Sequence, residues 1–334
     1  MKIVFYECEE WEKRYLIKKL SGQNAVFIAK PLNGQTAKYA EDADVVSVFI
    51  YSSLTRAVLE KLPKLRAITT RSTGFDHIDM EYCRDKHIVA CNVPEYGTHT
   101  VAEHTFALIL ALSRHLIESV DRTRRGNFDL RGLMGFDLFG KTIGIIGLGS
   151  IGRSVVAIAK GFGMHVIVYT RHPSEKEAKE LGITLLDLPE LLATSDIITL
   201  HVPLTRETHH MINSKNIGKC KKGSLLINTA RGGIVETEAI IKGLDRHILG
   251  GVGLDVLEEE RVVKEERQLL SSKFLADCDV KTQLLNHVLL NQDNVIVTPH
   301  NAFHSREALT KILDVTVANV LGFSTGIPEN IVTL

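Results

Sequence analysis

Residues 141–171, KTIGIIGLGSIGRSVVAIAKGFGMHVIVYTR, decide the fold of this chain. The apolar run at 143–146 predicts a strand, and the runs at 154–162 and 165–169 predict a helix followed by a second strand. Three glycines in the spacing GxGxxG stand between the first strand and the helix. This order of strand, glycine turn, helix and strand is the context in which the spacing indicates a dinucleotide-binding site.

Each glycine of this motif has a separate physical task. Gly147 permits the tight turn, Gly149 lets a pyrophosphate approach the backbone, and Gly152 lets the helix pack closely against the strand. The helix that follows presents free N–H groups and the positive end of its dipole to phosphate oxygens. We therefore expect these three glycines to belong to a cofactor site.

Strands and helices alternate on both sides of the motif, which predicts parallel sheets with helices on both faces. A last helix, at 305–321, is expected to return to the first part of the chain. The other expected helices of that part are 11–20, 53–62 and 77–86. The other expected strands are 2–7, 45–51, 65–71, 87–93, 197–202, 224–228, 250–254 and 295–297.

The composition is that of a globular protein long enough for two domains. Hydrophobic residues make up 44% of the 334 residues, and 40 basic side chains balance 40 acidic ones. A net charge of zero gives no electrostatic attraction to nucleic acid or to an anionic membrane surface. We expect neither as a partner, and no apolar run approaches the roughly 18 residues that a membrane span needs.

The five cysteines are widely spaced, with no CxxC pair and no spacing typical of a metal site. Reduced thiols in the cytoplasm are the simplest interpretation, and no metal is expected. The first residues, MKIVFYECEE, turn acidic too early for a signal peptide. The sequence therefore predicts a cytoplasmic protein.

The segment 101–117, VAEHTFALILALSRHLI, predicts one long helix that is apolar on every side between 105 and 112. A helix that is apolar all round has no side suited to water. We therefore expect this helix to be buried between domains and also by a second copy of the chain. The expected assembly is a homodimer that forms through this region.

The residues after the second strand of the glycine unit bear on the choice of nicotinamide cofactor. An NAD site usually has Asp or Glu there, which binds the ribose 2′-hydroxyl. This chain has Thr170 at about that position, followed by Arg171. An arginine can hold a 2′-phosphate with two hydrogen bonds. The pair favours NADP(H), or use of both cofactors, and the alternative is a solvated arginine beside bound NAD.

Polar residues follow three late strands, at the edge where open parallel sheets bind their ligands. Arg231 follows the strand at 224–228, Asp255 ends the next strand, and His300 follows the strand at 295–297. An arginine can hold a carboxylate and polarise a carbonyl, and a histidine can donate a proton near neutral pH. This set suits the reduction of a 2-keto acid by a hydride from the cofactor.

Three glutamates at 258–260 come shortly after Asp255. A run of charged residues is usually a solvated face, and we expect two of these side chains to be solvated. One of the three, which the pattern alone does not identify, is expected beside His300, where a carboxylate stabilises the protonated imidazole.

Seven sequence blocks, some of them quoted above, together carry a resemblance to a known family. In chain order they are RSTGFDHID (71–79), VAEHTFALIL (101–110), GLGSIGR (147–153), LHVPLTRETHHMI (200–212), INTARGG (227–233), GLDVLEEE (253–260) and TPHNAF (298–303). In these blocks the chain resembles the D-isomer-specific 2-hydroxyacid dehydrogenases, over nearly its whole length. The resemblance implies an α/β fold of two flavodoxin-like/Rossmann-like, doubly wound parallel-sheet domains with the active site in the cleft between them. It implies a substrate domain of residues 1–100 and 300–334, and a dinucleotide-binding domain of residues 101–299.

The resemblance also implies catalytic and substrate-binding roles for the matching residues. Arg231 would bind the substrate carboxylate, and His300 would be the acid/base catalyst. Glu260, the last of the three glutamates, would be the partner of His300. The backbone N–H groups of Thr73 and Gly74 would help to hold the carboxylate.

The same resemblance implies the contacts to NAD(P). Ser150 and Ile151 would lie at the pyrophosphate, and Asp255 would bind the carboxamide. The other implied cofactor contacts are Val202 and Pro203 near the adenosine, Thr208 in the same loop, and Thr229 and Ala230 at the nicotinamide ribose. For the substrate, the resemblance implies that Tyr51 and Phe49 shape the pocket.

Within the family the chain looks most like the D-lactate dehydrogenases, through VFIYSSLT (48–55), TRSTGFDHID (70–79) and Phe303. His304 departs from that branch, which commonly has a second aromatic residue there. Glyoxylate, hydroxypyruvate and phenyl- or branched-chain keto acids are therefore alternatives to pyruvate.

Two other functions are compatible with this fold. A nucleotide-sensing interaction protein, similar to the corepressors that share the fold, would carry peptide-docking surfaces. A formate or phosphite dehydrogenase is the other alternative, and Glu260 argues against formate because formate enzymes of this family carry an amide there.

Overall fold

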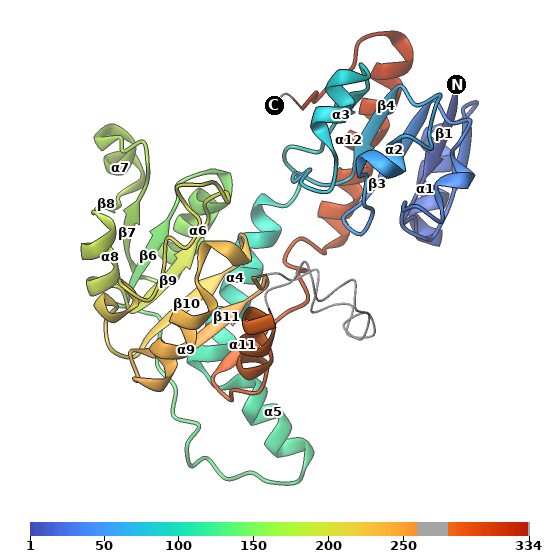
Figure 1. The fold of residues 1–334 in the computed structure, drawn as a ribbon. Helices are drawn as coiled ribbons and strands as arrows, with labels where there is room; N and C mark the ends of the chain where they lie inside the picture. Colours follow the sequence, from blue (N-terminus) through green and yellow to red (C-terminus); the bar gives the residue numbers. More distant parts are fainter. Residues whose placement is uncertain (259–279, 333–334) are drawn as a thin grey trace. The chain divides into compact units, whose positions relative to one another are not determined.

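A computed structural model describes residues 1–258 and 280–332 of the chain (Figure 1). The chain forms two compact units, and each is described here by itself. Unit 1 comprises Met1–Tyr96 and His304–Leu334, and unit 2 comprises Gly97–Phe303. Residues 97–100 and 300–303, which the sequence placed with the first unit, belong to unit 2. The physical reason is local: residue 97 begins a helix of unit 2, and buried Asp255 of unit 2 holds the backbone at 301–302.

Unit 1 is built on a five-stranded parallel sheet in the order β2-β1-β3-β4-β5. This is the order of flavodoxin-like doubly wound sheets. The edge strand β2 was not predicted, because only two of its four side chains are partly buried and its apolar pattern is correspondingly short. The strands are β1 (Lys2–Phe5), β2 (Asn24–Phe27), β3 (Val45–Val48), β4 (Ala67–Thr70) and β5 (Val89–Cys91).

Helices cover both faces of this sheet (Figure 1). On one face, Leu16 of α1 and Leu313 and Val317 of α12 pack on apolar side chains of β1, β3 and β4. The C-terminal helix therefore supplies part of the core of unit 1. The helical elements are α1 (Glu10–Lys19) and α12 (Arg306–Thr325) on this face, and η1 (Ala37–Tyr39), α2 (Arg56–Leu59) and α3 (Met80–Asp85) on the other.

Unit 2 is built on a seven-stranded parallel sheet in the order β12-β11-β10-β9-β6-β7-β8. Starting from β6, this is the Rossmann order, with the direction of the strand order reversing between β6 and β9. The prediction of two doubly wound parallel sheets is confirmed. The strands are β6 (Thr142–Ile146), β7 (His165–Tyr169), β8 (Thr184–Leu185), β9 (Ile197–Leu200), β10 (Ser224–Asn228), β11 (Leu249–Leu254) and β12 (Val295–Val297).

Two apolar layers enclose this sheet. On one face α4 packs against α6, β10 and β11, and on the other face α8 packs on β6 and β7 and α9 packs on β11. Helix α6 begins at the first residue after Gly149, four residues earlier than predicted. The helical elements are α4 (Thr98–Ser113), α5 (Leu116–Arg124), α6 (Ser150–Gly161), α7 (Glu175–Leu181), α8 (Leu188–Thr194), η2 (Ile217–Lys219), η3 (Gly232–Ile234), α9 (Thr237–Asp245) and α11 (Val280–Leu290).

The expectation of one continuous helix over 101–117 is wrong. Helix α4 ends at Ser113, and His115 has a left-handed backbone with φ of +48°, from which α5 begins. Within the single chain Ala107 of α4 is exposed, and its burial by a second copy of the chain stays a prediction. A left-handed residue ends the hydrogen-bond ladder, and the apolar residues that follow therefore lie on a separate, exposed helix.

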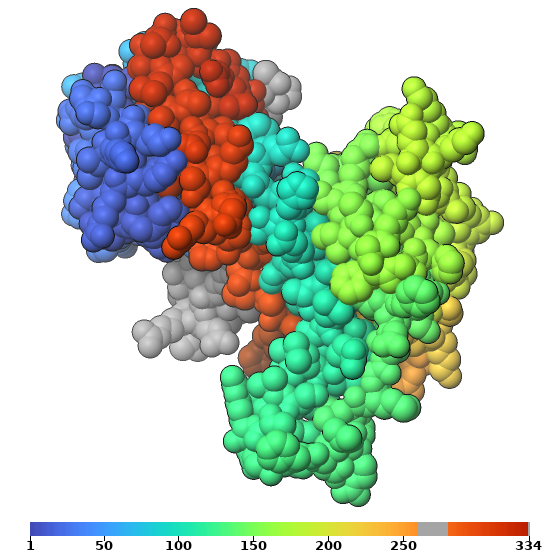
Figure 2. Space-filling model, turned by 180° about the vertical axis from the view of Figure 1, so that it is seen from behind, coloured from blue at the N-terminus to red at the C-terminus, as the bar shows by residue number. Residues whose placement is uncertain are grey.

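Helix α5 and the residues after it carry a group of exposed apolar side chains. Figure 2 shows this segment as a lobe that stands out from the rest of unit 2. Such side chains are common singly on protein surfaces, but a group of this size on one segment indicates contact with something apolar. We call this group the apolar arm: Leu116, Ile117, Val120, Phe128, Leu130, Met134 and Phe139.

Among the described residues, no helix combines the length and the apolar character needed to cross a bilayer.

Candidate active site

The glycine turn lies where β6 and β9 part, at the switch point of the sheet of unit 2. Gly147 has φ of +103°, and a Cβ there would lie 2.5 Å from the carbonyl oxygen of His201. A Cβ on Gly152 would lie 2.2 Å from the carbonyl oxygen of Gly147. At Gly149 no heavy atom comes within 4 Å of such a Cβ. The turn thus requires the first and third glycines for its own fold, and the second faces open space.

The first turn of α6 leaves its N–H groups without a side-chain cap. Gly149 is the N-cap residue, and it has no side chain that could accept from Ser150, Ile151 or the residue after them. The uncapped donors and the helix dipole together favour an anion at this position. The twelve-residue helix and the open space at Gly149 suit a phosphate group.

Thr170 and Arg171 directly follow β7, and the guanidinium is exposed. Arg171 has an acidic neighbour, Glu207, from the loop after β9. The pKa of the Glu207 carboxyl is lowered chiefly by a hydrogen bond from the Thr205 hydroxyl, at 2.7 Å, and also by the charge of Arg171. The position after β7 therefore offers an exposed cation with one carboxylate in its surroundings.

Thr208 shapes the loop that carries Val202 and Pro203. Its hydroxyl donates to the carbonyl of Pro203 at 2.6 Å and accepts from the N–H of Thr205 at 2.7 Å. The bonds of Thr208 are thus made within the protein, and its effect on a cofactor would be through the shape of the loop. His201, the residue before Val202, is neutral at physiological pH because burial lowers its pKa to about 3.

Three adjacent strands end beside one another and carry the predicted reactive residues. Strand β10 pairs with β11, and β11 pairs with β12, all in parallel. Arg231 follows β10, Asp255 follows β11, and His300 follows β12. Because parallel strands end at the same edge, residues 24 to 69 positions apart in the sequence gather at one rim of the sheet. Among these three, Arg231 and His300 present the predicted anion-binding and proton-donating groups.

Buried Asn228, at the end of β10, fixes the turn that presents Arg231. Its amide donates to the carbonyl of Arg231 at 2.9 Å and accepts from the N–H of Ala230 at 3.0 Å. The guanidinium of Arg231 donates to the carbonyl of Ala230 at 2.7 Å. Next to it, the Thr229 hydroxyl lies 3.1 Å from that of Thr105 in α4. The predicted ribose-binding pair, Thr229 and Ala230, is thereby held in a defined shape.

Asp255 is the anchor of the turn that carries His300. Its side chain is 1% exposed, and both of its oxygens accept hydrogen bonds: from the Thr298 hydroxyl at 2.6 Å and from the N–H groups of Asn301 and Ala302 at 2.9 Å each. These bonds fix the backbone on both sides of His300, which has φ of +55°. The predicted carboxamide contact of Asp255 stays a prediction, and its positioning of His300 was missed.

His104 of α4 is a second residue that the sequence reasoning missed. Its Nε2 atom lies 3.1 Å from the Thr298 hydroxyl oxygen and 3.6 Å from an oxygen of Asp255. The signal was a histidine inside an otherwise apolar helix, but its partner stands 194 positions away in the sequence. Such a contact becomes visible only when the helix is placed on the sheet.

Glu260 lies outside the described residues, but the path toward it can be followed as far as Glu258. A Cβ on Gly232 would lie 2.1 Å from the carbonyl group of Leu257 and 2.4 Å from the nitrogen of Glu258. The turn after Arg231 therefore rests directly on the backbone that leads from Asp255. The Glu258 side chain is largely buried, at 15% exposure, rather than solvated, with Thr237 and His210 as its partners.

In unit 1, Thr73 and Gly74 lie in the loop after β4. The Thr73 hydroxyl donates to the carbonyl of Val93 at 2.9 Å, and the amide of Asn92 donates to the carbonyl of Thr73 at 2.9 Å. Within the described part of the chain, the N–H groups of Thr73 and Gly74 donate to no acceptor. The loop is thus held by its other polar groups, which leaves these two donors available to an anion.

The loop with Tyr51 is held by a single carboxylate. Glu7 accepts from the N–H of Phe49 at 2.9 Å, from the N–H of Tyr51 at 2.7 Å and from the Ser52 hydroxyl. Fully buried Arg71 donates to the carbonyl groups of Tyr6 and Glu7 at 2.8 and 2.7 Å. This network fixes the backbone at Tyr51, whose side chain is 60% exposed.

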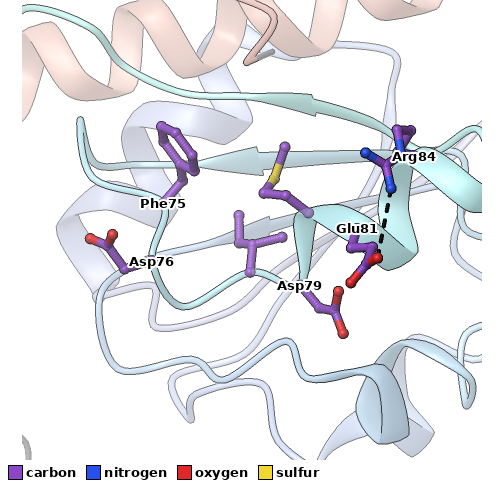
Figure 3. A pocket seen from close by; sticks show the side chains of 7 residues that line it. Phe75, Asp76, Asp79, Glu81 and Arg84 are labelled. Carbon is purple, nitrogen blue, oxygen red and sulfur yellow. Dashed lines mark ion pairs between the residues drawn. The ribbon is translucent and has the colours of Figure 1, made fainter. Parts of the chain in front are cut away.

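A cavity of about 470 Å³ in unit 1 is lined by residues that follow Thr73 and Gly74 in the sequence: Phe75, Ile78 and Met80, together with charged side chains (Figure 3). Asp76, Asp79 and Glu81 supply three carboxylates against the one guanidinium of Arg84, which lies 3.8 Å from Glu81. Like charges repel, so an excess of carboxylates disfavours an anionic ligand. The cavity is therefore a poor site for a keto acid.

Comparison with known proteins places these features in a family. Residues 106–302 match the family model described as D-isomer specific 2-hydroxyacid dehydrogenase, NAD binding domain. The chain is 35% identical to the D-lactate dehydrogenase of Escherichia coli, over 98% of both chains, and 35% identical to the glyoxylate reductase of Pyrococcus horikoshii, over 88% of this chain and 84% of that one. The solved structure of D-lactate dehydrogenase from Aquifex aeolicus complexed with NAD and lactic acid superimposes with a TM-score of 0.84, at 37% identity, over 97% of this chain and 96% of that one.

Proposed function

Because the chain belongs to the D-isomer-specific 2-hydroxyacid dehydrogenase family, we propose that it reduces pyruvate, or a close relative of pyruvate, to the D-2-hydroxy acid with NAD(P)H. The observation that carries the proposal is the placement of Arg231, Asp255 and His300 at the ends of three adjacent strands. A guanidinium and an imidazole at one rim of a nucleotide-binding sheet match what keto acid reduction requires.

Each residue has a defined task in this reaction. The Arg231 guanidinium binds the substrate carboxylate and withdraws electrons from the neighbouring carbonyl. The His300 imidazolium gives its proton to the carbonyl oxygen as the alcohol forms, and Glu260 stabilises that imidazolium. The bound nicotinamide supplies the hydride. The N–H groups of Thr73 and Gly74 add two further donors for the substrate carboxylate.

The keto acid itself is proposed from the relatives and from the residues after the catalytic histidine. Both D-lactate dehydrogenases and a glyoxylate reductase are among the relatives, so a two- or three-carbon keto acid is favoured. Phe303 lies edge-on to His300, with ring centroids 6.5 Å apart. A bulky apolar side chain beside the proton donor limits the size of substrate that fits, and we therefore place pyruvate ahead of phenyl-substituted keto acids.

A spectrophotometric screen tests the proposal. Pyruvate, glyoxylate, hydroxypyruvate, phenylpyruvate and a branched-chain keto acid are each combined with NADH and with NADPH, and the lactate formed from pyruvate is resolved on a chiral column. We expect pyruvate or glyoxylate to give the highest kcat/KM, and pyruvate to yield D-lactate. L-lactate as the product, or no turnover with any of the acids, would refute it.

Two variants test the residue assignment. Arg231→Gln and His300→Ala are each expected to lower kcat/KM by about 100- to 10,000-fold, the range for loss of an anchoring or proton-transfer group. The affinity for NADH, measured by fluorescence titration, is expected to stay within threefold. The matched controls are Arg246→Gln and His247→Gln, which replace exposed residues after α9. Activity near that of the wild type in either site variant would remove the assignment.

We further propose that the chain accepts NADPH, alone or beside NADH, through Arg171. The support is the lack of an acid directly after β7 and the presence of an exposed guanidinium there. Glu207 opposes this preference because its charge would repel a 2′-phosphate. Arg171→Gln should therefore raise the KM for NADPH and leave that for NADH unchanged, whereas Glu207→Gln should lower the KM for NADPH. A wild-type protein that strongly prefers NADH would end this proposal.

We also propose that two copies of the chain associate through the apolar arm. The support is the number of large apolar side chains that this segment exposes, four of which, Phe128, Leu130, Met134 and Phe139, are at least 78% accessible. A second copy of the chain supplies an equivalent apolar surface, and most soluble oligomers are symmetric pairs of this kind.

A further inference from the structure

A cluster of nitrogen and oxygen ligands lies in unit 2, outside the residues assigned to the reaction. Its members are His209, His210 and Glu258, and each offers one ligand atom within 4.8 Å of the other two. The two imidazole rings are stacked with centroids 3.9 Å apart, and Nε2 of His210 lies 2.5 Å from an oxygen of Glu258. We propose that this cluster binds one divalent zinc ion.

The backbone holds the two histidines on the same side. Neighbouring residues of an extended chain point in opposite directions, but His210 has φ of +50°, a left-handed conformation that brings its ring beside that of His209. Its N–H donates to the carbonyl of Gly233 at 2.9 Å, and its carbonyl accepts from the Asn213 amide at 2.8 Å. These two bonds hold the His210 peptide on both sides and keep its ring stacked on that of His209.

The Glu258 carboxylate is oriented so that one oxygen faces the histidines. Its other oxygen accepts from the N–H and from the hydroxyl of Thr237, at 3.1 and 2.8 Å. The backbone carbonyl of Glu258 accepts from the amide of Asn286 at 2.8 Å. Partners of this kind orient the ligands of protein metal sites and raise their affinity. The carboxylate therefore needs no reorientation to bind a cation.

The donor set selects the type of cation. Two imidazole nitrogens and one carboxylate oxygen suit zinc, which takes three protein ligands and a water molecule in its open sites. Calcium and magnesium prefer oxygen ligands and are disfavoured here. His209 is exposed, and His210 and Glu258 are partly covered, so the fourth position faces water.

Zinc binding would change the contact between His210 and Glu258. The ion would replace the proton between His210 and Glu258, because a ligating imidazole must be deprotonated at the ligating atom. The distance between Nε2 and the carboxylate oxygen would grow from 2.5 Å to about 3.3 Å, as tetrahedral bonds of about 2.0–2.1 Å require.

The separation of the ligands along the chain explains why the sequence showed no such site. His209 and His210 are adjacent, and Glu258 follows 48 residues after His210, in a run of glutamates. The site uses neither Arg231 nor His300, so its existence does not depend on the proposed reaction.

Equilibrium dialysis of the full-length, chelator-treated protein against zinc sulfate tests the proposal, with bound metal measured by atomic absorption. We expect one tightly bound zinc ion per chain. His209→Gln, which changes an exposed side chain and leaves the bond between His210 and Glu258 in place, should weaken binding at least tenfold. His247→Gln removes another exposed histidine of unit 2 and should leave binding unchanged.

Thermal unfolding gives a second readout that is independent of dialysis. Zinc should raise the Tm of the wild-type protein and of His247→Gln, because a ligand that binds only the folded state stabilises it. It should raise the Tm of His209→Gln much less, and magnesium at the same concentration should have no effect. Equal zinc content in the wild type and in His209→Gln, or no bound zinc in the wild type, would overturn the proposal.

Discussion

At the scale of single residues, the buried carboxylate of Asp255 connects the fold to the proposed chemistry. It receives hydrogen bonds from three residues of the turn 298–302 and thereby fixes His300 in a left-handed conformation. A histidine that transfers protons must keep its orientation through the reaction. Asp255 is therefore a positioning residue for His300, whatever contact it makes with a cofactor.

Replacing Asp255 by asparagine tests this positioning role. Asparagine keeps the size but loses the charge and presents a donor where two N–H groups and a hydroxyl need acceptors. We expect kcat to fall at least tenfold and the free energy of unfolding to fall by about 2 kcal/mol, the range for a hydrogen bond to a charged group. Steady-state kinetics and urea unfolding measure the two effects.

The control for this prediction is Asp245→Asn, at the exposed end of α9. It should change neither quantity. A variant of Asp255 that lost stability but kept the kcat and the pH profile of the wild type would show that the carboxylate has a structural role only.

The low pKa of His201 predicts how the free energy of unfolding depends on pH. Burial lowers its pKa from the usual 6.5 to about 3 in the folded protein. Between these two values the unfolded chain binds a proton that the folded chain does not, so stability falls as the pH is lowered through this window. His201→Gln, which keeps a partner for the Thr199 hydroxyl at 2.9 Å, removes that contribution.

Urea unfolding at several pH values between 7 and 4.5 measures the effect. We expect the stability of His201→Gln to decline less steeply with acidification than that of the wild type. His165→Gln, an exposed histidine at the start of β7, should follow the wild-type curve. A decline as steep in His201→Gln as in the wild type would contradict the assignment.

The residues proposed to react could be identified from the sequence because each directly follows an apolar strand. Arg231 and His300 stand out in this way without any knowledge of the fold. Their supporting partners could not be predicted, since Asp255 meets Thr298 across 43 positions and His104 meets it across 194. Which side chain reaches across a parallel sheet depends on strand order, and local patterns do not contain that order.

At the scale of elements, the contact between the glycine turn and α6 is the most constrained feature. A Cβ on Gly152 would overlap the carbonyl oxygen of Gly147, at 2.2 Å, and this oxygen belongs to the backbone, which cannot move aside as a flexible side chain can. Gly161, at the end of the same helix, has no heavy atom within 4 Å of such a Cβ and no positive φ. The two glycines of one helix therefore provide a matched comparison.

Gly152→Ala is expected to lower the free energy of unfolding by about 1–3 kcal/mol, the cost of overpacking, and to weaken NADH binding because the first turn of α6 must shift. Gly161→Ala is expected to be neutral or to stabilise the protein by up to about 1 kcal/mol, since alanine restricts the unfolded chain. Urea unfolding and fluorescence titration with NADH measure both effects. Unchanged stability and affinity in Gly152→Ala would contradict the close approach.

Several elements depart from what their sequence predicts, for identifiable reasons. The stretch 101–117 is split at His115, because a left-handed residue cannot be recognised from an apolar pattern. The edge strand β2 was missed because only two of its four side chains are partly buried, and β8 was missed because it has only two residues. Strands such as β3, β4 and β10, which are covered on both faces, were predicted correctly because they appear as continuous apolar runs.

At the scale of the whole molecule, the apolar arm predicts self-association. Sedimentation velocity should show a dimer for the wild-type chain, and Phe128→Glu combined with Leu130→Glu should yield monomers, because each new charge would have to be buried in the contact. Ile17→Glu, on an exposed face of α1 in unit 1, is the control and should remain dimeric. A wild-type chain that sediments as a monomer at all concentrations would rule out the assembly.

The central claim is that Arg231 and His300 meet one substrate beside bound nicotinamide, and a crystal structure with NADH and oxamate, an unreactive analogue of pyruvate, tests it most directly. The account predicts two hydrogen bonds between the Arg231 guanidinium and the oxamate carboxylate, and the His300 imidazole at about 3 Å from the oxamate carbonyl oxygen. Oxamate bound with neither side chain within hydrogen-bond distance would contradict it.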